Sequence, residues 1–128
     1  MAGELILIVE DNEKNLKLVR DLLQLNGYRT LEAETARDAI ALATEHAPDL
    51  ILMDIQLPDM DGVTALNRLR GEPSTAALRV VALTAFAMRD DRERFLASGF
   101  DGYLTKPIDI KQFPELIRQQ CELGRRVE

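Results

Sequence analysis

The chain has very little of several residue types. Of its 128 residues none is tryptophan, one is cysteine (Cys121) and one is histidine (His46). A lone cysteine excludes an intramolecular disulfide, and one cysteine with one histidine is too few for a structural zinc site. No apolar run approaches the length needed to span a bilayer, and the N-terminal MAGELILIVED lacks the basic region of a signal peptide. We expect a cytoplasmic protein without a membrane partner.

Positive charge is also scarce, because 16 Lys and Arg stand against 22 Asp and Glu and leave a net charge of -6. Such a surface argues against nucleic acid as a partner. The hydrophobic fraction of 46% and the charged fraction of 30% are ordinary for a globular protein. With no repeat or linker, we expect one domain over residues 1–128, with its core from about residue 4 to residue 122 and a short C-terminal tail.

Short strand-like runs alternate with segments of helical periodicity. The run at 28–33 is more polar and predicts an edge strand; the full set of runs is 5–9, 28–33, 50–53, 80–83 and 102–105. Apolar residues between them repeat at helical spacing, with helix ends near Asn26–Gly27, Pro48, Gly71 and Gly99 and a fifth helix around Phe113. This alternation predicts an α/β fold: a doubly wound, flavodoxin-like parallel sheet of five strands in the order 2-1-3-4-5, with five helices.

Polar side chains follow the central strands of this predicted sheet. They are two acids after the first strand, one acid after the third, a hydroxyl after the fourth and an amine after the fifth: Glu10, Asp11, Asp54, Thr84 and Lys106. Because the carboxyl ends of parallel strands meet at one edge, where such folds bind ligands, we expect these groups to lie close together.

The chemistry of these groups favours phosphoryl transfer. Clustered carboxylates repel one another, and Mg²⁺, which prefers oxygen ligands, relieves that repulsion. Asp11 and Asp54 are candidates for direct ligands and Glu10 for a ligand through water, while a free oxygen of Asp54 can serve as a nucleophile. The Thr84 hydroxyl and the Lys106 ammonium suit phosphoryl oxygens.

Four motifs together resemble the receiver domain of two-component response regulators. They are VEDN (9–12), LILMDIQLPDMDG (50–62), ALTAFA (82–87) and GYLTKP (102–107). The resemblance covers nearly the whole chain, and VEDNEKN and LTAFAM are most similar to DivK-like single-domain regulators and to the receivers of hybrid kinases.

The resemblance implies a role for each residue of the site. Asp54 would accept phosphate from a histidine kinase, and Mg²⁺ (or Mn²⁺) would be held by Asp11, Asp54 and the backbone carbonyl of Gln56, with Glu10 acting through water. Thr84 and Lys106 would bind the phosphoryl group. Tyr103 would turn inward when Thr84 moves toward the phosphate. As a further hypothesis, Gln56 and Phe86 tune hydrolysis by controlling the access of water.

The resemblance also implies partners. We expect a histidine kinase or histidine phosphotransfer protein upstream. A downstream protein would bind the face made by the fourth helix, fifth strand and fifth helix, which includes parts of 86–98, Tyr103 and parts of 108–119. The chain stops after the fifth helix, so we expect no output domain. We expect a monomer or a phosphorylation-dependent dimer, and no enzyme beyond self-catalysed phosphoryl acceptance and slow autodephosphorylation.

Other interpretations remain open from the sequence. One is a relay intermediate that passes phosphate to a histidine phosphotransfer protein, and another is a phosphate-independent pseudo-receiver. A Mg²⁺ phosphohydrolase is disfavoured because Gln56 stands where such enzymes have a second aspartate, and a nucleotide carrier because no Gly-rich phosphate loop is present. Glu10 and Asp11 could instead simply cap the following helix, and we expect Asp59 and Asp61 to be turn and cap residues.

Overall fold

The computed structural model describes residues 3–85, 89–106 and 108–123, and only the backbone of 89–92. Within them, strands and helices alternate strictly along the chain. The strands are β1 Leu5–Val9, β2 Arg29–Ala33, β3 Leu50–Asp54, β4 Val80–Thr84 and β5 Gly102–Thr105. The helices are α1 Glu13–Leu25, α2 Ala36–His46, α3 Gly62–Gly71, α4 Arg89–Ala97 and α5 Phe113–Leu123. The described helices include none that is both long enough and apolar enough to cross a bilayer.

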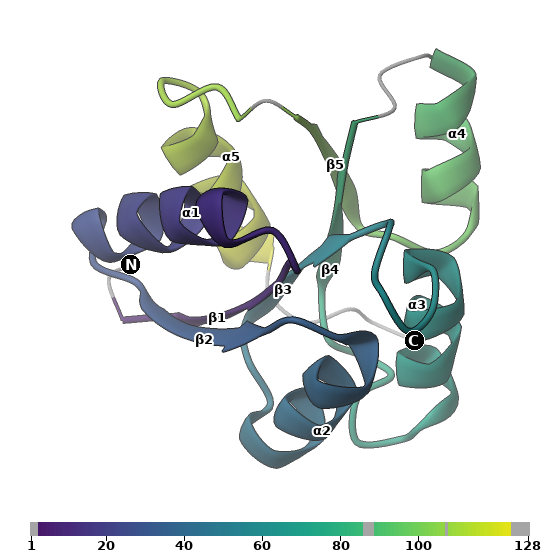
Figure 1. Cartoon of the computed structure of the whole chain (residues 1–128). Coiled ribbons are helices and arrows are strands. Elements are labelled where there is room, and N and C mark those ends of the chain that lie inside the picture. The colour runs from purple at the N-terminus through teal and green to yellow at the C-terminus, as the bar shows by residue number, and fades with distance from the viewer. Residues whose placement is uncertain (1–2, 86–88, 107, 124–128) are drawn as a thin grey trace.

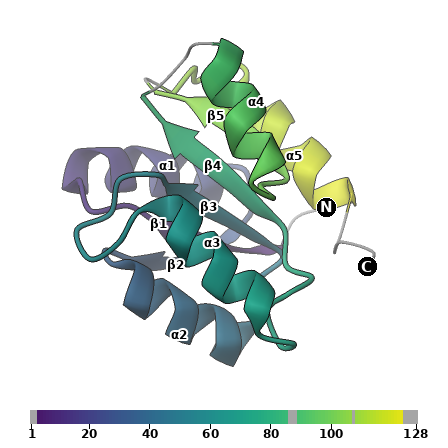
Figure 2. The same ribbon diagram turned by 90° about the vertical axis from the view of Figure 1, so that its right-hand side faces the viewer.

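The five strands form one parallel sheet in the order β2-β1-β3-β4-β5. Helices α1 and α5 cover one face, and α2, α3 and α4 cover the other (Figure 1). Figure 2 shows α2, α3 and α4 side by side in front of the sheet. The predicted fold class, strand order and edge position of β2 are therefore confirmed, and every residue of the central strands β3 and β4 is buried.

Alternation along the strands builds two hydrophobic clusters, one on each face of the sheet. In β1, Leu7 and Val9 face α2 and α3, whereas Ile6 and Ile8 face α1 and α5. The first cluster takes small side chains from α2 and larger ones from α3 and α4; the second takes the apolar stripes of α1 and α5. Two covered faces hold the carboxyl ends of the strands in a fixed arrangement.

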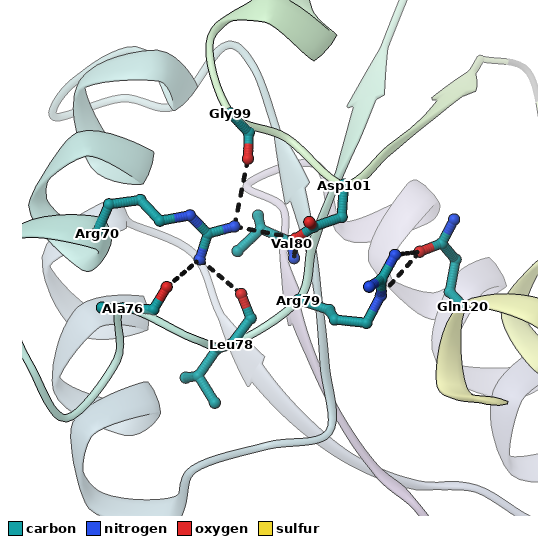
Figure 3. A network of polar contacts seen from close by, with 8 residues as sticks. All are labelled: Arg70, Ala76, Leu78, Arg79, Val80, Gly99, Asp101 and Gln120. Atoms are coloured by element: carbon teal, nitrogen blue, oxygen red, sulfur yellow. Dashed lines mark hydrogen bonds and ion pairs between the residues drawn. The ribbon is translucent and has the colours of Figure 1, made fainter. Parts of the chain in front are cut away.

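A polar network stabilises the opposite edge of the sheet, where β4 and β5 begin (Figure 3). Arg70, near the end of α3, donates to the carbonyls of Ala76 (3.1 Å), Leu78 (2.6 Å) and Gly99 (3.3 Å) and pairs with Asp101 (2.9 Å). The same Asp101 oxygen accepts the Val80 N–H at 2.8 Å. One guanidinium thus joins the end of α3, the start of β4 and the loop between α4 and β5.

Candidate functional site

Three side chains meet at the carboxyl edge of the sheet, delivered there by β1, β3 and the segment after β5. Lys106 Nζ lies 2.7 Å from Asp54 Oδ2 and 2.7 Å from Glu10 Oε1. The contact between Lys106 Nζ and Asp54 Oδ2 has the geometry of a hydrogen bond. The contact with Glu10 Oε1 is an ion pair without that geometry. Glu10 and Asp54 are only 1% and 6% exposed, so one ammonium group balances two buried carboxylates.

The excess of negative charge at this site shifts the pKa values of Glu10 and Lys106. Burial, and then the neighbouring Asp54 carboxylate, raise the pKa of Glu10 from 4.5 to about 7, although Lys106 opposes the shift. Burial works against the charged form of Lys106, but its attraction to the Asp54 and Glu10 carboxylates prevails and raises its pKa. Lys106 therefore stays protonated at neutral pH, and the site gains from any further positive charge.

The acidic groups fit a divalent cation. Glu10, Asp11 and Asp54 each offer a carboxylate oxygen, and these oxygens lie within 4.8 Å of one another. Asp11 is exposed while the other two are buried, so the cluster opens to solvent on one side. Three features suit a hard cation such as Mg²⁺. The candidate ligand atoms are all oxygens, the cluster is open on one side, and one buried oxygen of Glu10 receives no hydrogen bond from the described residues.

The loop between β3 and α3 fixes the orientation of Asp54. The backbone N–H of Gln56 donates to Asp54 Oδ1 at 2.9 Å, while Oδ2 faces Lys106. Farther along, Gln56 and Asp61 form an isolated bridge, and the Gly62 N–H donates to the Ile55 carbonyl at 2.6 Å. A Cβ at position 62 would lie 2.8 Å from Ile55 Cα and 2.9 Å from the Asp54 carbonyl oxygen, so the closure of this loop requires glycine.

Comparison with known proteins decides the family. The family model of the response regulator receiver domain matches residues 6–118. The chain belongs to this family. Receiver domains act in two-component signalling, bind Mg²⁺ at an acidic site and are typically phosphorylated on an aspartate.

Individual relatives agree with this assignment. DivK, the polar-differentiation response regulator, is 45% identical in both Brucella ovis and Brucella abortus, and the match covers 88% of this chain and 92% of each relative. A receiver domain of a sensor histidine kinase from Pseudomonas aeruginosa, solved with magnesium in its active site cleft, has a TM-score of 0.86 at 33% identity, covering 94% of this chain and 99% of that one. A CheY-like receiver from Methanospirillum hungatei has a TM-score of 0.84 at 27% identity, covering 95% and 96%. The receiver is a DivK-like response regulator.

Two further residues predicted for the site, Thr84 and Tyr103, lie on the neighbouring strands β4 and β5. Thr84 is buried at the end of β4, beside β5, and its carbonyl accepts the Lys106 N–H at 2.8 Å. Tyr103 on β5 is half-buried and stacks on Phe95 of α4, with ring centroids 5.9 Å apart. Phe86, for which we predict a role in tuning hydrolysis, lies outside the described residues. The switch role of Tyr103 stays a prediction.

The structure also shows which of the acids cap helices. The cap of α1 is Asn12, whose side chain accepts the Asn15 N–H at 3.0 Å, so α1 does not take its cap from Glu10 or Asp11. Asp61 caps α3, as predicted, by accepting the Thr64 N–H at 2.8 Å. Asp59 also caps a helix, but that helix is α2, more than twenty residues earlier in the chain.

Proposed function

We propose that this receiver accepts a phosphoryl group on Asp54 from the phosphohistidine of a histidine kinase or a histidine phosphotransfer protein, and that the change is passed to a downstream protein. The observation that carries the proposal is the position of Lys106 Nζ, 2.7 Å from both Asp54 and Glu10 at the ends of the strands. This lysine joins the nucleophile to the acidic cluster and places a positive charge where a phosphoryl oxygen arrives.

The chemistry follows from how Asp54 is held. The Gln56 N–H and Lys106 fix its two oxygens, so the carboxylate presents a defined direction to the incoming phosphorus. The new O–P bond forms as the P–N bond to the donor histidine breaks, and the histidine nitrogen leaves with the electron pair. The Lys106 ammonium then contacts a phosphoryl oxygen, and the Thr84 hydroxyl at the end of the adjacent strand is assigned to another.

Mg²⁺, or Mn²⁺, is the expected cofactor, held by Asp11, Asp54 and the Gln56 carbonyl, with Glu10 acting through water. Bound there, the cation neutralises the charge shared between the carboxylates and the phosphoryl oxygens. Glu10 is assigned this role because it is buried and offers a carboxylate oxygen within 4.8 Å of those of Asp11 and Asp54. Gln56, exposed beside Asp54, is further assigned to control the access of water during hydrolysis.

Output is assigned to the face formed by α4, β5 and α5. Exposed apolar residues occur in these elements: Leu96 on α4, Leu116 on α5 and Ile110 (58% exposed) in the segment between β5 and α5. Thr84 and the half-buried Tyr103 are the proposed link between the phosphoryl site and that face. In this account the protein works in the cytoplasm as a phosphorylation-controlled binding switch, without turnover of an external substrate.

The test is a titration with beryllofluoride, a phosphoryl analogue, in the presence and absence of Mg²⁺, followed by amide NMR shifts. We expect Mg²⁺-dependent shifts at Thr84, Tyr103 and Lys106. Asp54→Asn should abolish them. Asp49→Asn, which changes an exposed acid just before the same strand, should respond as the parent does. An unchanged response in Asp54→Asn would refute the proposal.

A further inference from the structure

The loop between β3 and α3 is tied to a helix that is remote in sequence. The Asp59 carboxylate accepts the Ala36 N–H through Oδ1 at 2.9 Å and the Arg37 N–H through Oδ2 at 3.0 Å. Both oxygens are therefore used on the first turn of α2. The hydrogen bond from the Ala36 N–H contributes most to lowering the pKa of Asp59, and the bond from the Arg37 N–H adds to it, although desolvation opposes the shift. The carboxylate is therefore charged at neutral pH.

The first turn of α2 divides its donors between two caps. Thr35, the local cap, accepts the Asp38 N–H at 3.1 Å, and Asp59 takes the two N–H groups before it. Without Asp59 those two groups have only water as an acceptor. Two side chains thus cap the same helix, but only Asp59 stands on the loop that leads away from Asp54.

This loop has few other polar anchors. Its base is closed by the Gln56–Asp61 bridge and by the bond from the Gly62 N–H to the Ile55 carbonyl. Among the described residues, the loop tip at residues 57–60 makes no backbone–backbone hydrogen bond to another segment. Leu57 and Met60 are only partly buried against the hydrophobic cluster beneath. The Asp59 carboxylate is the main polar tie at the tip.

We propose that Asp59 is a positioning residue for the phosphoryl site: by clamping the loop tip to α2, it holds Gln56 in place beside Asp54. The Gln56 N–H contacts Asp54 Oδ1, and its carbonyl is the proposed ligand of Mg²⁺. Asp59 itself contacts neither. The part that concerns Mg²⁺ rests on the proposed function, whereas the part that concerns the Gln56 N–H rests on the described contacts alone.

The competing explanation is that Asp59 only stabilises α2. Thr35→Ala is the matched control, because it also removes a cap from α2 but leaves the loop tip attached. We would compare the parent with Thr35→Ala, Asp59→Ala and Asp59→Asn, the last of which retains one acceptor oxygen. The readouts are amide hydrogen exchange of the metal-free protein and the Kd for Mg²⁺ from NMR titration.

Asp59→Ala should speed exchange of the Gln56 N–H by about fivefold and raise the Kd for Mg²⁺ by about five- to tenfold. Asp59→Asn should fall between this variant and the parent. Thr35→Ala should change both quantities by less than about twofold, although exchange in α2 quickens.

Unchanged Gln56 exchange in Asp59→Ala would overturn the inference, and so would an equal effect of Thr35→Ala on Gln56. A parent that binds no Mg²⁺ would instead contradict the proposed function. Gln56 exchange in the metal-free variants would then still decide whether Asp59 positions the loop.

Discussion

Replacing Arg70 by methionine should cost much more stability than one arginine usually does. The guanidinium pairs with Asp101 and donates to three backbone carbonyls, and the two side chains are only 17% and 9% exposed (Figure 3). Methionine keeps much of the aliphatic volume but removes the guanidinium that pairs with Asp101 Oδ2, the oxygen that also accepts the Val80 N–H. Breaking a buried pair from one side costs about 3–5 kcal/mol. Because water can reach part of this edge, we expect a loss of about 3 kcal/mol.

The assay is urea unfolding followed by circular dichroism, with equal m-values as the sign that two-state behaviour is kept. Arg118→Met is the control, since Arg118 also pairs with two acids, Glu115 and Glu122, but is 48% exposed. That variant should lose far less stability than Arg70→Met, because solvent screens an exposed ion pair. In a double-mutant cycle, Arg70→Met with Asp101→Asn should be less destabilised than the sum of the single variants. If Arg70→Met costs no more than Arg118→Met, the importance given to this network is refuted.

Three further predictions concern the site. Gly62→Ala should destabilise the fold by about 2 kcal/mol in urea unfolding, because the new Cβ would collide with backbone atoms. Gly71→Ala is the control, since the space around that residue is open, and it should cause no such loss. Equal effects of the two substitutions would contradict this prediction. In metal-free protein the raised pKa of Glu10 favours folding at low pH, so the free energy of unfolding should fall by about 2–3 kcal/mol as pH rises from 4.5 through 7, and Glu10→Gln should flatten that slope. Lys106→Met should bind Mg²⁺ about tenfold more tightly in calorimetry, because a cation 2.7 Å from two carboxylates is removed; weaker binding would contradict the described charge balance.

The strand-borne part of this site was predictable from the sequence. Each of Glu10, Asp54 and Thr84 lies at or just after the end of an apolar run, and a parallel sheet of known strand order brings such positions to one edge. The identity of the family added the roles, which the spacing alone left open. Asp61 was likewise expected to be a turn or cap residue, and it caps α3.

Contacts made across loops were not predictable in the same way. Asp59 was expected to be a turn or cap residue, but the helix that it caps could not be predicted. Its carboxylate caps α2, because the path of the loop between β3 and α3 decides which N–H groups it meets. Arg70 gave no sequence signal, since its partners are mostly backbone carbonyls from two separate loops. Such contacts depend on how the elements pack, and neither periodicity nor residue type encodes them.

The most direct test of the proposed function is to find which residue accepts the phosphoryl group. The protein would be incubated with acetyl phosphate and Mg²⁺, the acyl phosphate reduced with borohydride, and the peptides mapped by mass spectrometry. Reduction turns a phosphorylated aspartate into homoserine. We expect homoserine at position 54 alone, none when EDTA removes the metal, and none in Asp54→Asn. Homoserine at another aspartate, or at position 54 in equal amount without a divalent cation, would contradict the proposed function.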